Sequence, residues 1–162
     1  MGWITLSLRK LVLTQRVNEL EHRLTKLSQE HQSLSNGSSY TERFMGVRKS
    51  EAYKELLTNY SNNMNTTAAK YQNGAVTDIS MAAQYNVDIQ QNQLDYMFQK
   101  MNLESIFTAE ENALRDEVNQ KENHLDLEQE QIETQLEAAR AEKEQLDQAI
   151  SQDIKSSTIS LV

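Results

Sequence analysis

The chain has 162 residues, a net charge of -8, a mean hydropathy of -0.71 and only 6% aromatic residues, so it can bury little compact core. It contains no Pro and no Cys, which excludes disulfides and thiolate chemistry and removes the strongest helix breaker. The composition therefore predicts an all-α fold, an elongated helical hairpin or coiled-coil-like bundle with long N- and C-terminal helices.

The two ends of the chain carry opposite charge. Residues 1–54 contain nine basic and five acidic side chains, about +4, whereas residues 109–162 contain fourteen acidic and five basic side chains, about -9. We therefore expect the first and last helices to pack together, either within one subunit or between subunits.

Residues 9–34 are predicted to form the first helix. Its apolar residues step by three and four positions over about three heptads, which indicates a seam that packs against another helix. The seam consists of Leu13, Val17, Leu20, Leu24, Leu27, His31 and Leu34. His31 is its polar member, and a polar residue in a seam commonly fixes the register or the number of partners.

An apolar segment lies at the start of the chain. Four of its side chains suit one helix face or a terminal insertion: Trp3, Ile4, Leu8 and Leu11. A short apolar end of this kind is a candidate for insertion between subunits. Because Arg9 and Lys10 adjoin it, contact with an anionic membrane is the less favoured alternative.

The middle of the chain is predicted to contain two helices and two turns. Gly37, within residues 35–39, marks the first turn, because Gly readily takes the left-handed conformation that ends helices. Helices are expected over residues 50–72 and 78–101, with a second turn at 73–74. The helix expected over residues 50–72 carries an aromatic stripe where helices should meet, formed by Tyr53, Tyr60, Met64 and Tyr71. The helix expected over residues 78–101 carries an apolar stripe formed by Ile79, Ala83, Val87, Leu94, Phe98 and Met101.

The last predicted helix covers residues 109–154 and is rich in Glu, Gln, Ala and Leu, which are strong helix formers. Thr108 and Glu111 have capping-box spacing, so the helix either begins there or continues from the helix before it. Its packing residues recur at heptad spacing or widen that stripe: Val118, Leu125, Ile132, Leu136, Leu146 and Ile150.

These elements divide the chain into three predicted regions. Residues 1–39 form a basic N-terminal heptad helix and turn, residues 40–107 a central helical region with an Asn- and Tyr-rich turn, and residues 108–162 an acidic long C-terminal helix with a short tail. The sequence contains no recognisable secretory signal or transmembrane segment. We therefore expect a cytoplasmic protein, one exported by a signal-independent route, or part of a virion.

Motifs for catalysis or cofactor binding are missing from the sequence. Glu19 and His22 have the spacing of half a di-iron signature, but the second half is lacking, and the four glycines are too scattered for a phosphate-binding loop. We therefore expect no catalytic, cofactor or metal site, and no enzyme activity. The acidic total and the lack of a compact basic patch also argue against nucleic acid as a partner.

The predicted arrangement, helical ends with a central excursion, resembles that of flagellin-like and type III secretion filament subunits, although the same outline suits a virion protein or a coiled-coil adaptor. We expect a non-enzymatic structural subunit that self-assembles through its terminal helices into a filament, secretion apparatus or virion component. Its partners would be copies of itself or other helical proteins. The alternative is a coiled-coil adaptor or chaperone that binds a partner protein, with a membrane-peripheral N-terminus.

Overall fold

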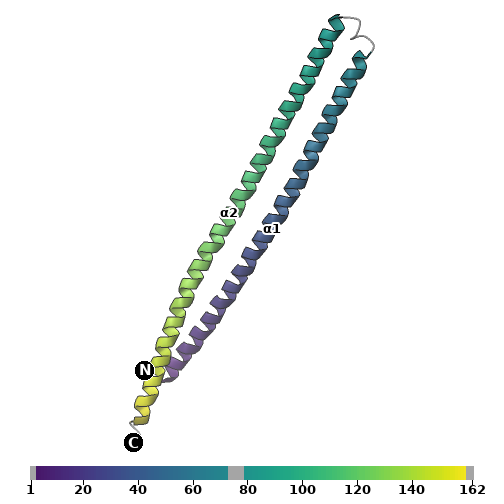
Figure 1. Cartoon of the computed structure of the whole chain (residues 1–162). Helices are drawn as coiled ribbons and strands as arrows, with labels where there is room; N and C mark the ends of the chain where they lie inside the picture. The colour runs from purple at the N-terminus through teal and green to yellow at the C-terminus, as the bar shows by residue number, and fades with distance from the viewer. Residues whose placement is uncertain (1–2, 73–78, 160–162) are drawn as a thin grey trace. The chain divides into compact units, whose positions relative to one another are not determined.

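A computed structural model describes residues 3–72 and 79–159, which form two α-helices (Figure 1). Helix α1 spans Trp3–Tyr71 and helix α2 spans Ile79–Ile159. Helix α1 is followed by a turn at Gln72, whose backbone N–H lies 3.4 Å from the carbonyl oxygen of Ala69. The second predicted turn, at residues 73–74, lies outside the described residues.

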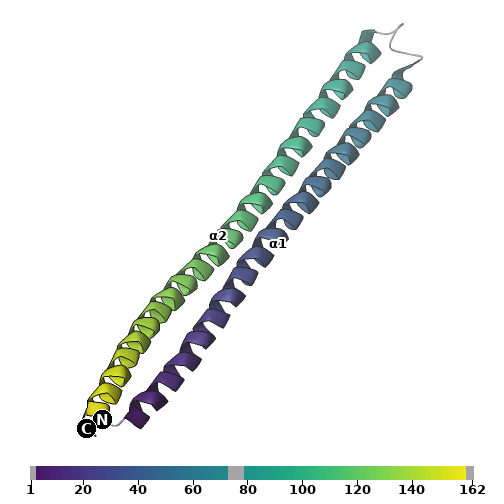
Figure 2. The same cartoon turned by 60° about the horizontal axis from the view of Figure 1, so that its bottom comes forward.

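The chain divides into two units, each built from one segment of α1 and one segment of α2. The first unit contains Met1–Asn36 and Val118–Val162, and the second contains Gly37–Glu117. Within each unit the two segments lie side by side and run antiparallel (Figure 1 and Figure 2). The predicted all-α fold with a helical hairpin is therefore confirmed.

The turn predicted around Gly37 is wrong, because α1 continues through residues 35–39 without a break. Neither Gly37 nor Gly46 has a positive φ, and a Cβ added at either position would meet nothing within 4 Å. Helix packing explains why the helix persists. Ser38, Thr41 and Met45 step by three and four residues along the side of α1 that is partly or fully buried. The cost of Gly within a helix, about 1 kcal/mol, is small against the packing of a continuous helix.

The four predicted helical segments form two continuous helices in the structure. The segments expected over 9–34 and 50–72 belong to α1, and those expected over 78–101 and 109–154 belong to α2. Thr108 lies inside α2, so the alternative in which the third segment runs on into the fourth is the one observed. With no Pro in the chain, nothing between these segments forces the backbone hydrogen bonds to break.

Apolar side chains along the facing sides of the helices form a narrow core. Leu27 is the most deeply buried large side chain among the described residues, with 1% of its surface exposed. In the first unit Val17, Leu136 and Ala139 form a buried cluster against which Leu20 and Leu24 pack. In the second unit the buried side chains are Met45, Leu56, Tyr71 and Phe107. The core of each unit is thus a narrow seam between its two helix segments, as two packed helices allow.

Candidate interaction interface

The seam of the first unit contains every side chain predicted to pack between the terminal helices. From α1, Leu13, Val17 and Leu27 are buried, and Leu20, Leu24, His31 and Leu34 are half-buried. From α2, Ile132, Leu136 and Leu146 are buried, and Val118, Leu125 and Ile150 are half-buried. The structure brings the two sets together within one chain. This seam is therefore occupied inside the subunit.

Ion pairs between the helices flank this seam. Arg9 pairs with Glu142, Lys10 with Asp147 and Arg23 with Glu128, and in each case the base comes from α1 and the acid from α2. Arg140 and Glu21 pair in the opposite sense at 2.6 Å. The hydrogen bond with Glu128, followed by its charge, raises the pKa of Arg23. Apart from the half-buried Glu128, these side chains are substantially exposed to water. The pairs therefore contribute more to which helices associate, and in which register, than to stability.

His31 is the polar residue of the seam. Its Nε2 lies 3.5 Å from Oδ1 of Asp126, beyond normal hydrogen-bond distance. The Nε2 atom is buried and has no hydrogen-bond partner. A buried polar atom without a partner lowers stability, so His31 is a costly member of an otherwise apolar seam.

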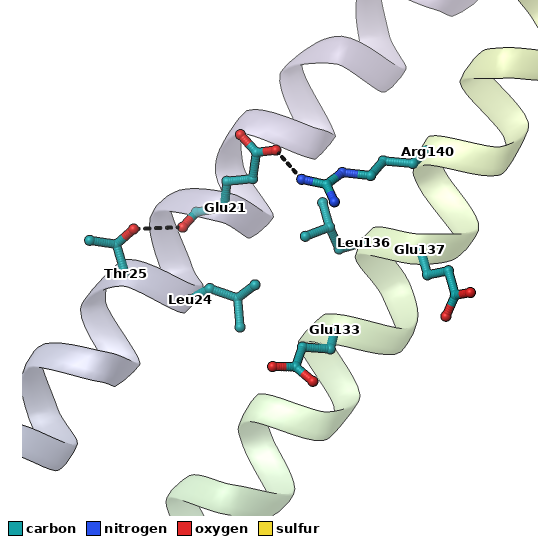
Figure 3. Close-up of a pocket in the computed structure, with 7 residues that line it drawn as sticks. All are labelled: Glu21, Leu24, Thr25, Glu133, Leu136, Glu137 and Arg140. Carbon is teal, nitrogen blue, oxygen red and sulfur yellow. Dashed lines mark hydrogen bonds and ion pairs between the residues drawn. The ribbon is translucent and has the colours of Figure 1, made fainter.

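A shallow groove runs along one side of the first unit (Figure 3). Leu24 and Leu136 provide apolar surface, while Glu133, Glu137 and the Arg140–Glu21 pair carry its charges. Charged residues from both helices thus line an open surface, with no imidazole or activated nucleophile among the lining residues. The groove therefore combines a small apolar surface with charges of both signs.

A polar and aromatic cluster joins the helices of the second unit near the end of α1. The hydroxyl of Tyr71 donates a 2.7 Å hydrogen bond to Oδ2 of Asp88, and Lys70 Nζ lies 3.2 Å from the same oxygen. The Tyr71 ring packs edge-on against Tyr85 at 5.5 Å. Hydrogen bonds from Tyr71, and then from Gln84 and Lys70, lower the pKa of Asp88. Hydrogen bonding to Tyr71, and then to Asp88, raises the pKa of Lys70.

Two further contacts join α1 and α2 elsewhere in the second unit. Tyr60 packs on Tyr96 with ring centroids 4.6 Å apart, and Nδ2 of Asn92 donates a 2.8 Å hydrogen bond to Oγ1 of Thr67. The prediction that helices meet along the tyrosine stripe is therefore confirmed at Tyr60 and Tyr71. The partners on α2 were not predicted, because their polar and aromatic character gives no apolar periodicity.

The apolar stripe predicted in the following segment faces the other way. The residues of α2 that pack toward α1 include Tyr85, Ile89, Asn92, Tyr96, Leu103 and Phe107. At about 100° per residue, four exposed apolar residues of the predicted stripe lie roughly half a turn around the helix from that set. We call them the outward stripe of α2: Val87 (56% exposed), Leu94 (49%), Phe98 (62%) and Met101 (62%).

Two other apolar sets on α1 are also exposed. The outward stripe of α1 lies in the second unit and consists of Tyr40, Phe44 and Val47, each more than half exposed. In the first unit the terminal stripe consists of Ile4, Leu8, Leu11 and Val12, likewise more than half exposed. Three of its members belong to the apolar end predicted to insert between subunits. The side chain of Trp3, the remaining predicted member, lies outside the described residues.

Neither a metal-binding cluster nor a membrane-spanning helix is found in the described part of the chain. No group of three or more His, Asp or Glu side chains there could hold a metal ion. No helix within residues 3–72 and 79–159 is long and apolar enough to cross a membrane. The chain matches no protein-family model, no curated protein and no solved structure.

Proposed function

We propose that this chain is a non-enzymatic structural subunit that self-assembles, through outward-facing apolar stripes on its helices, into a larger assembly such as a filament, a secretion apparatus or a virion component. The observation that carries the proposal is the pair of opposite faces on α2 in the second unit. One face packs on α1 through Tyr96 and Phe107, and the other presents Leu94 and Phe98 to water.

Exposed apolar side chains at helical spacing support association between helices. Single exposed apolar residues are normal on any protein, but a row of four along one helix face is typical of an interface. The same holds for the terminal stripe around Leu8 and for the stripe around Phe44. Several such faces on one subunit would allow each copy to contact more than one neighbour, which an extended assembly requires.

The terminal segments would contribute through their outer faces. Their apolar seam is already filled within the chain by residues such as Leu27 and Leu136, so it is not available to a neighbour. The terminal stripe on α1 remains exposed and is the part of the N-terminal helix suited to contact another copy. Removing residues 1–12 would delete this stripe while keeping Leu13 and most of the seam.

Light scattering of the purified full-length protein over a wide concentration range tests the proposal. We expect a mass above the 18.7 kDa of one chain that rises with concentration, and ordered particles by negative-stain microscopy. Deleting residues 1–12 should reduce the size of these particles. A monomer at all concentrations, unchanged by the deletion, would overturn the proposal. A finite complex with one co-purifying protein would instead favour the coiled-coil adaptor.

A further inference from the structure

We propose that the outward stripe of α2 binds the same stripe of a second copy, with the two α2 helices antiparallel. The inference deepens the proposed self-assembly and rests on it: it names the surface, the occupant and the direction of the first contact. The product would be a symmetric dimer in which two helical hairpins form a four-helix arrangement at the second unit.

Apolar area is the first reason. Leu94, Phe98 and Met101 step by four and three residues, and Met97 beside them is 58% exposed. These side chains cover about two turns of α2 with a continuous apolar surface on the side away from α1. Phe and Met have large apolar areas, and aromatic residues and Met are enriched at the centres of protein interfaces. Burial of this surface against another helix would remove it from water.

The side chains flanking the stripe favour a second copy over a charged partner. They are mainly amides, including Gln84, Gln90, Gln91 and Asn102, and the nearest carboxylates are Asp95 and Glu104. Antiparallel pairing centred between residues 97 and 98 places Leu94 against Met101 of the second copy. In the same register Asp95 lies level with Lys100 of that copy and Glu104 level with Gln91, so neither carboxylate lies directly opposite a like charge.

The outward stripe of α1 is less suited to this first contact. It has three apolar residues, Tyr40, Phe44 and Val47, and the next turns of the helix present Glu51 and Lys54. Contact of that stripe with the stripe of α2 would be heterologous, because different surfaces would meet and each copy would leave one of them open. A dimer through the stripe of α2 closes on itself.

Cysteine cross-linking tests the pairing, because the native chain contains no Cys. In the proposed dimer, Phe98 lies next to the two-fold axis, so F98C should form an intermolecular disulfide on mild oxidation. Position 87 would face position 108 of the second copy. With a rise of about 1.5 Å per residue, the two V87C positions would then lie about 30 Å apart and should not cross-link. A mixture of V87C and T108C should cross-link.

Each alternative arrangement gives a different result. Disulfides formed by V87C alone would mean parallel helices and would overturn the antiparallel dimer. Disulfides formed by F98C only when mixed with F44C would mean a heterologous contact and would overturn it as well. Oligomers that form with no disulfide at F98C would contradict this inference while leaving the proposed self-assembly intact, whereas a monomeric wild-type chain would contradict both.

Charge substitution gives a second, independent test with a matched control. Phe98→Asp should abolish the dimer, so that the smallest species in solution has the mass of one chain instead of two. Phe44→Asp changes the same residue type at similar exposure on α1 and should leave the dimer intact. Far-ultraviolet circular dichroism should show unchanged helix content in both variants, since neither side chain is buried. Loss of the dimer in both variants, or in neither, would contradict the assignment.

Discussion

The hydroxyl of Tyr71 donates a 2.7 Å hydrogen bond to the carboxylate of Asp88 and so joins the last turn of α1 to α2. Tyr71 is buried, with 5% of its surface exposed, while Asp88 also accepts hydrogen bonds from Lys70 and Gln84. The ionised carboxylate is the form that accepts all three bonds. The contact between the helices at this end of the second unit therefore depends on the charge of Asp88.

Acid should weaken this end of the second unit. The folded pKa of Asp88 lies below its unfolded value, so its contribution to the free energy of unfolding is fully present above the unfolded pKa, about 3.8. The contribution is lost as the pH falls from about 4 through the folded pKa. We expect thermal unfolding, followed by circular dichroism, to show a smaller drop in Tm across this window for Asp88→Asn than for the wild type.

Tyr71→Phe provides a second test of the same hydrogen bond from its donor side. It removes the largest cause of the lowered pKa of Asp88 while keeping the aromatic ring against Tyr85. It should therefore reduce the acid dependence of Tm in the same direction as Asp88→Asn. If both variants lose Tm with falling pH as steeply as the wild type, the hydrogen bond to Asp88 does not contribute to the acid sensitivity of the fold.

Replacing Gly37 with Ala should stabilise the protein. Gly37 lies within α1, does not have a positive φ, and has open space where a Cβ would be placed. Ala in a helix interior is favoured over Gly by about 0.5–1 kcal/mol, because the unfolded Gly chain has more conformational freedom. Chemical denaturation should show this gain in the free energy of unfolding. A loss of stability would instead indicate the left-handed turn expected from the sequence.

Gly46→Ala is the matched comparison. Gly46 also lies in α1 with nothing within 4 Å of an added Cβ, but it lies outside the predicted turn. Both substitutions should give gains of similar size, about 0.5–1 kcal/mol each. A gain at Gly46 together with a loss at Gly37 would locate a break in α1 near residue 37.

Buried and exposed leucines should respond very differently to truncation. Leu27 is 1% exposed in the seam of the first unit, whereas Leu127 on α2 of the same unit is 60% exposed. Leu27→Ala should lower the free energy of unfolding by about 2–5 kcal/mol, through lost burial and the cavity left behind. Leu127→Ala should change it by less than about 0.5 kcal/mol. Similar losses for both would mean that Leu127 is covered, for example by another subunit.

The seam of the first unit was predictable because its residues repeat in heptads on both helices. Leu13, Val17 and Leu27 on α1, and Ile132 and Leu136 on α2, are the buried residues that this spacing indicates. Opposite charges at the two ends also indicated which helices would pair, as the Arg23–Glu128 pair illustrates. In this unit local periodicity and the observed packing agree.

The second unit was less predictable, because its seam is not the most apolar face of α2. Leu94 and Phe98 dominate the sequence pattern of α2, yet Tyr96 and Asn92 face α1. Which face packs depends on the register between two helices, and periodicity within one helix does not contain that information. The prediction of a turn at Gly37 was wrong for a related reason, because the packing of a continuous helix outweighed the local preference for a turn.

Replacing His31 with Leu should stabilise the first unit. The seam around His31 is apolar, and its buried Nε2 has no hydrogen-bond partner, so the imidazole lowers stability where it stands. We expect His31→Leu, measured by chemical denaturation at pH 8, to raise the free energy of unfolding by about 1 kcal/mol. His22→Leu is the control, since His22 lies on the exposed face of the same helix and should change stability by less than about 0.5 kcal/mol. A loss of stability in His31→Leu would mean that the contact with Asp126 outweighs the burial cost. A gain accompanied by a change in the number of associated chains would show that His31 limits which partners the seam accepts.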